Sequence, residues 1–119
     1  MLEYTINNTV YKFNAGFAFI RAIQPVKKDA AGGDQGLMWT MAGVMDRDPE
    51  RLRDALLAMN TGQEPRITQD DLEAWLEQHE DLEKVFVEVS DFFGRANCTT
   101  STWSRLQAVV TLANAAKKG

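Results

Sequence analysis

The chain has 119 residues, of which 45% are hydrophobic and 25% charged, and this composition excludes intrinsic disorder and low-complexity repeats for the chain as a whole. One cysteine and one histidine exclude an internal disulfide and a typical zinc site of Cys and His ligands. The net charge of −4 arises in the second half, where residues 67–91 contain nine acidic residues and one basic residue. This acidic surface is predicted to repel nucleic acid.

No apolar run approaches the roughly 18 residues that a membrane span needs, and the N-terminus lacks a basic segment followed by an apolar one. The lone Cys98 agrees with a reducing compartment. We therefore expect a single domain, residues 1–119, that acts in the cytoplasm without contact with a membrane.

Residues 2–13 alternate between apolar and polar side chains, with Asn7 and Asn8 in the middle. Asn tolerates the left-handed conformation that a two-residue hairpin turn requires. If these two residues form the turn, Glu3 lies opposite Lys12 on one face. The other face then gathers the apolar residues Leu2, Tyr4, Ile6, Tyr11 and Phe13. The pattern predicts a β-hairpin whose apolar face packs on helices.

Residues 14–116 are predicted to form about six short helices, which makes the fold class α+β and mostly α. We expect Asn14 to cap the first helix and Pro25 to end it. Residues 26–36 are rich in glycine but lack the Gly-Lys-Ser/Thr ending of a phosphate-binding loop, so they are interpreted as a flexible connection. A second helix is expected over residues 37–45.

The remaining helices have clearer start signals. Asp48, followed by Pro49, is expected to cap a helix that ends near Asn60, and Thr68 is expected to cap the next. Apolar residues recur at helical spacing over residues 82–93, which indicates the strongest amphipathic helix. The last helix is predicted from about residue 103, with Ser101 or Thr102 as its cap, and a short basic tail is expected after it.

The chain offers little for catalysis. Cys98 and His79 are the only candidates for a nucleophile and its base, and chance placement of one of each makes a working pair improbable. The carboxylates of residues 67–91 are expected on solvated helix surfaces, without the apolar pocket that would separate their pKa values. We therefore predict a protein that is not an enzyme and uses no metal or cofactor.

Binding to another protein is the remaining class of function. Met38, Met41 and Met45 recur at helical spacing, with Trp39 beside them. Because methionine is flexible and polarisable, such residues form grooves that accept apolar helices of a partner. The alternative interpretation is that these four residues fill the core of a small domain.

The order of these features resembles a known family. The segment at residues 2–13 is followed by Gly-Phe-Ala-Phe-Ile-Arg at residues 16–21, a loop with glycines, Asp48-Pro49, the segment 65–76 and the helix 82–93. This arrangement is similar to the tail assembly chaperones of long-tailed bacteriophages, most to those of siphovirus-type phages of Gram-positive hosts. The similarity covers about residues 2–112, and it departs from the family at Asn8, where Gly is expected.

The resemblance implies a cytoplasmic protein that coats the long helical tape measure protein and keeps it soluble until tail tube subunits polymerise around it. It also implies self-association, absence from the finished virion, and a frameshifted longer form whose extra C-terminal domain recruits the tail tube protein. The alternative is a small tail or head-to-tail connector protein that stays in the virion. A nucleic-acid-binding regulator is disfavoured by the acidic second half.

The resemblance and the Lys117-Lys118 pair together generate a prediction about the gene. Two lysine codons can form an uninterrupted run of adenines, on which a ribosome slips back by one base. We expect the codons of Lys117 and Lys118 to form such a run, with an open −1 frame that continues into a second domain. Sequencing the gene checks this, and a −1 frame that closes at once would exclude a frameshift at this position.

Overall fold

The computed structural model describes the backbone of residues 1–118 and the side chains of residues 1–115. The N-terminal hairpin consists of β1 (Leu2–Ile6) and β2 (Thr9–Phe13), which pair antiparallel with Glu3 opposite Lys12. Asn7 and Asn8 adopt φ angles of 52° and 63°, which are the left-handed values of a two-residue turn. The predicted register and the predicted apolar face are confirmed, since Ile6 and Phe13 are buried while Glu3 and Lys12 are exposed.

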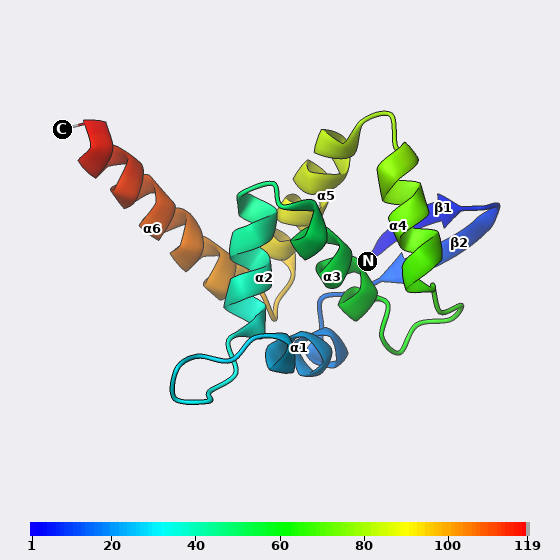
Figure 1. Cartoon of the computed structure of the whole chain (residues 1–119), viewed down its shortest axis with the longest axis horizontal. Coiled ribbons are helices and arrows are strands. Elements are labelled where there is room, and N and C mark those ends of the chain that lie inside the picture. The colour runs from blue at the N-terminus through cyan, green and yellow to red at the C-terminus, as the bar shows by residue number, and fades with distance from the viewer. Residues whose placement is uncertain (119) are drawn as a thin grey trace.

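Six α-helices follow within residues 1–118, which confirms the α+β, mostly α, fold class (Figure 1). They are α1 (Phe17–Ile23), α2 (Gly36–Met45), α3 (Pro49–Met59), α4 (Gln69–Gln78), α5 (Leu82–Arg95) and α6 (Thr100–Lys118), with a 3₁₀ turn, η1 (Gln24–Val26), after α1. The Asp48 carboxylate accepts from the backbone N–H groups of Glu50 and Arg51 at the start of α3. The Thr68 hydroxyl accepts from the backbone N–H of Asp71 at the start of α4, so both predicted caps are confirmed.

Two predicted helix starts are wrong. Asn14 does not cap α1, because the helix starts two residues later than expected, with Gly16 as its N-cap and no side-chain hydrogen bond there. The backbone N–H of Asn14 donates to the carbonyl of Met59 at 2.8 Å, which holds this segment against the end of α3. The last helix begins at Thr100, ahead of the predicted Ser101 or Thr102 cap. The preceding residues fold back on α5, since the hydroxyls of Thr99 and Thr100 donate to the carbonyls of Phe93 and Gly94 at 2.7 Å each.

Two further expectations differ from the structure. The connection between α1 and α2 contains an antiparallel bridge between Lys28 and Asp34, and the Asp29 carboxylate accepts from the backbone N–H groups of Ala31 and Gly33. This segment is therefore a hydrogen-bonded turn.

The last helix is longer than expected, since α6 has 19 residues. It continues to Lys118, through most of the segment where a basic tail was expected, and Gly119 of that tail lies outside the described residues.

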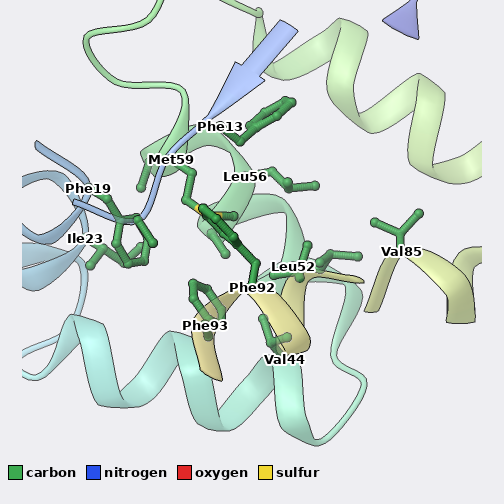
Figure 2. Close-up of a cluster of buried hydrophobic side chains, with 14 of the residues drawn as sticks. Phe13, Phe19, Ile23, Val44, Leu52, Leu56, Met59, Val85, Phe92 and Phe93 are labelled. Atoms are coloured by element: carbon green, nitrogen blue, oxygen red, sulfur yellow. The ribbon is translucent and has the colours of Figure 1, made fainter. Parts of the chain in front are cut away.

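The core lies where α3 and α5 meet the other elements. Helix α3 packs against α1, α2, α4 and β2, and α5 packs against α2 and α6. Figure 2 shows the apolar side chains that these elements point toward one another. Phe93 of α5 is central, since its ring lies 5.7 Å from that of Phe19 and 5.6 Å from that of Trp103. The buried set includes Phe13, Phe19, Ile23, Val44, Leu52, Leu56, Met59, Val85, Val89 and Phe93.

Helix α6 leaves this core after its first two turns. Trp103 is buried and Leu106 is half-buried, but each residue from 107 to 115 is exposed. The helix continues away from the body, at the opposite end of the molecule from the hairpin (Figure 1). This extension gives the molecule its elongated dimensions of 49 × 33 × 25 Å.

Tyr4 fastens the hairpin to two helices. Its ring lies 4.9 Å from that of Trp75 in α4, and its hydroxyl donates to the Glu88 carboxylate of α5 at 3.2 Å. Burial raises the pKa of Tyr4 above its ordinary value, and the negative charge of Glu88 raises it further. The folded protein therefore retains the phenolic proton at a pH where the unfolded chain loses it.

This pKa shift predicts a loss of stability in alkali. Above about pH 10 the unfolded chain binds fewer protons than the folded one, so the free energy of unfolding decreases as the pH rises. We expect Tyr4→Phe to be less stable than the wild type by about 0.5–1.5 kcal/mol at pH 7, because the hydrogen bond is lost. This difference should shrink above pH 10. Urea denaturation of both proteins across pH 7–11 measures it, and a constant difference would contradict this role of Tyr4.

Candidate partner-binding surfaces

The first candidate surface is the exposed side of α2 at its N-terminal end, formed by Met38 and Trp39. Their side chains are 41% and 43% exposed. Two cations lie over the Trp39 ring, the Lys27 ammonium at 4.7 Å and the Arg51 guanidinium at 5.2 Å from its centre. We call these four residues the α2 surface. It presents apolar and positively charged groups side by side.

Two glycines bring the α2 surface together. A Cβ on Gly36 would lie 1.7 Å from the carbonyl oxygen of Ile23, so only glycine lets the start of α2 approach α1 this closely. A Cβ on Gly43 would lie 2.0 Å from the Cγ of Arg51. The absence of a side chain at Gly43 therefore leaves room for the Arg51 stem, whose guanidinium lies over Trp39.

The four residues predicted from the methionine spacing do not form one surface. Met38 and Trp39 are exposed, whereas Met41 has no exposed surface and belongs to the core. Met45 is half-buried and packs against the core. Helical spacing places Met38, Met41 and Met45 near one another along one side of α2. Helix α2 packs on α3 and α5 with the face that carries Met41, so Met41 is buried while Met38 remains exposed. A partner-binding role for this set stays a prediction, which only Met38 and Trp39 are placed to fulfil directly.

The second candidate surface is a groove between the start of α3, α4 and the start of α5, which we call the α3–α4 groove. Its volume is about 480 Å³, and Pro49, Leu76 and Leu82 supply apolar surface. Charged and polar side chains also line it, namely Glu50, Arg53, Glu73, Glu77 and His79. In the sequence, this groove is indicated only by the excess of acidic residues at positions 67–91. Those residues are predicted to lie on solvated helix surfaces, and their pattern does not predict a groove.

Arg53 is the one basic residue among those lining the groove, and it is already paired. Its guanidinium lies 2.8 Å from the Glu73 carboxylate and 2.9 Å from that of Asp54. Hydrogen bonds to Glu73 and Asp54 raise the pKa of Arg53 above its ordinary value, so it remains charged. Two arginines, Arg51 and Arg53, are paired with three carboxylates, those of Glu50, Asp54 and Glu73, so this cluster is negative by one charge, and Glu77 adds a second negative charge to the groove.

The third candidate surface is the part of α6 that projects from the body, residues 108–115, which we call the α6 arm (Figure 1). Val109 is 63% exposed and Leu112 is 70% exposed, and Val110 is exposed as well. Fully burying one such side chain stabilises a complex by about 1.5–3 kcal/mol. This apolar helix segment without a packing partner among the described residues is therefore a candidate site of protein contact.

Cys98 and His79 do not come together. Cys98 lies in the connection between α5 and α6 and lines a pocket with Asn14 and Ala96, whereas His79 caps the end of α4 and packs edge-on against Trp75 at 5.0 Å. Within residues 1–118, no three Cys, His, Asp or Glu side chains are grouped to hold a metal ion. Likewise, none of the described helices is long and apolar enough to cross a membrane.

Comparison with known families assigns the chain to a class of protein. The family described as phage tail assembly chaperone protein matches residues 3–107. The chain belongs to this family. It therefore has a chaperone role in phage tail assembly, which is a non-enzymatic role. No curated protein and no solved structure matches the chain.

The family match covers two of the three surfaces of this tail assembly chaperone. The α2 surface and the α3–α4 groove lie within residues 3–107. The match ends at Gln107, where α6 leaves the body, so the α6 arm lies beyond it.

The structure predicts opposite outcomes for two methionines of α2. Met41→Glu places a carboxylate in the core without a partner, and we expect it to unfold the chaperone or cost more than about 4 kcal/mol. Met38→Glu changes an exposed residue of the same helix, so the free energy of unfolding should change by less than about 0.5 kcal/mol. Thermal unfolding followed by circular dichroism compares them, and equal effects would show that Met41 is not part of the core.

Proposed function

We propose that this tail assembly chaperone binds the tape measure protein of its phage and keeps it soluble while the tail tube polymerises. The observation that carries the proposal is the family match over residues 3–107, combined with an exposed Met38 and Trp39 on one helix. A long helical partner presents apolar side chains at helical spacing, and an exposed Met–Trp pair provides an adaptable surface for them. The cations over Trp39 favour partner segments that also carry acidic residues.

The wider proposal concerns the setting of this interaction. The chaperone acts in the host cytoplasm, associates with further copies of itself along the tape measure protein, and leaves before the virion is complete. The phage is a siphovirus of a Gram-positive host, and a frameshifted longer form recruits the tail tube protein. The charge excess of the second half, with nine acidic residues in residues 67–91, supports a protein-binding role over a nucleic-acid-binding one.

Co-expression with the tape measure protein of the same phage tests the central interaction. We expect wild-type chaperone to move the tape measure protein from the insoluble to the soluble fraction and to co-purify with it. Trp39→Ala should reduce the co-purified amount by more than about fivefold, because Trp39 is a large exposed aromatic anchor. Phe17→Ala is the matched control, since Phe17 is an exposed aromatic residue on a different helix.

Three results would contradict the proposal. They are a tape measure protein that is equally soluble without the chaperone, an unchanged yield with Trp39→Ala, and an equal loss with Phe17→Ala. The connector alternative is tested by mass spectrometry of purified virions. Stoichiometric amounts of this chain in the virion would establish a connector, whereas absence from virions and presence in assembly intermediates supports the chaperone.

A further inference from the structure

We propose that the α6 arm of one copy of the chaperone docks in the α3–α4 groove of a second copy. This inference rests on the self-association included in the proposed function, and it assigns that association to two surfaces. Both are unpartnered within residues 1–118: the arm projects from the body with Val109 and Leu112 exposed, and the groove is an open volume of about 480 Å³.

The arm carries apolar side chains on more than one face. Trp103, Leu106 and Val110 follow one another at spacings of three and four, and this stripe packs on the body at Trp103 and leaves it at Val110. Val109 and Leu112 are also three apart, but they share a different face of the helix. Helices with apolar side chains on several faces are typically packed against other protein segments on several sides. The body covers only the first of these faces, so a second protein surface is needed for Val109 and Leu112.

Charge selects the α3–α4 groove as the matching surface. Among the described side chains, α6 has no acidic residue and one basic residue, Arg105, which is exposed and lies four and seven residues before Val109 and Leu112, on the same face of the helix. The groove is lined by Glu50, Glu73 and Glu77, and its Arg53 is paired with Glu73 and Asp54. A positively charged apolar helix is therefore attracted to a negatively charged apolar groove.

The other large groove of the molecule does not match the arm in this way. It lies among the end of α2, α5 and α6, has a volume of about 570 Å³, and is lined by Arg47, Arg95 and Asp91. Arg47 is paired with Glu83 at 3.0 Å and Arg95 with Asp91 at 3.1 Å, so this groove offers no uncompensated negative charge to α6. The α3–α4 groove is thus the preferred site.

The position of the arm requires that the occupant be a second copy. In the structure the α6 arm projects away from α4, toward the other end of the molecule (Figure 1). The arm therefore does not reach its own groove. Docking between copies joins two different surfaces, and each added copy presents a free arm or a free groove. Such a contact generates open assemblies, which suits a chaperone that coats a long partner.

Two variants separate the two halves of this contact. Leu112→Asp places a charge on the arm, and Glu50→Lys/Glu77→Lys reverses the charge of the groove; all three positions are exposed. Each control makes the same change elsewhere. Thr111→Asp changes an exposed residue of the arm outside the face that Leu112 and Val109 share, and Asp46→Lys/Glu64→Lys reverses two exposed acidic residues outside the groove. Circular dichroism verifies that every variant is folded.

Sedimentation velocity at low salt and increasing protein concentration gives the decisive readout. We expect the wild type and both controls to form oligomers, and each test variant alone to be monomeric, with a dissociation constant raised more than about tenfold. An equimolar mixture of Leu112→Asp and Glu50→Lys/Glu77→Lys should form a 1:1 dimer, because one partner retains the groove and the other retains the arm.

A wild type that remains monomeric, a mixture that remains monomeric, or an equal loss with Thr111→Asp would overturn the proposal. A Glu50→Lys/Glu77→Lys variant that still associates alone, while Leu112→Asp does not, would indicate contact between two arms and would also overturn the proposal. Co-purification with the tape measure protein is measured on the same variants. Test variants that lose the oligomers but still bind the tape measure protein would agree with contact between arm and groove. Test variants that keep the oligomers but lose tape measure binding would assign the arm to the tape measure protein and reject the proposal.

Discussion

The side chain of Asn60 joins the three segments on which the rest of the fold depends. It has no exposed surface, and its amide nitrogen donates to the carbonyls of Lys12 at 3.0 Å and Pro65 at 3.2 Å. Its amide oxygen accepts from the backbone N–H of Ile67 at 2.8 Å. Only a side chain with both donors and an acceptor satisfies this set, and each buried group left without a partner costs about 1–3 kcal/mol.

These hydrogen bonds determine where the binding surfaces lie. Asn60 holds the end of α3 against β2 and against the segment that leads into α4, and the adjacent bond from Asn14 to Met59 fixes the start of α1. Helix α3 is thereby fixed between the hairpin and α4, with the α3–α4 groove on one side and Arg51 beside Trp39 on another. The packed body thus positions the three candidate surfaces, two at its rim and one on the α6 arm.

Local patterns in the sequence predicted much of the fold. The hairpin register followed from alternation and from two Asn residues in the turn, and the caps at Asp48 and Thr68 followed from side chains that bond their own helix. The missed features depend on contacts between distant segments. Asn60 was interpreted only as the end of a helix, because its partners at Lys12 and Ile67 are set by tertiary packing. Likewise, the spacing of Met38 and Met41 does not reveal which side of α2 faces the core.

Hydrogen exchange of the chaperone, free and bound to the tape measure protein, tests the central claim that a rigid body presents its partners with α2 and the α6 arm. The account predicts slower exchange on binding in the first turns of α2, and also in residues 108–115 together with the α3–α4 groove, because the bound copies associate with one another along the tape measure protein. It also predicts unchanged, slow exchange around Asn60 and in β2. Protection gained mainly in the hairpin and α1, with α2 and the arm unaffected, would contradict the account.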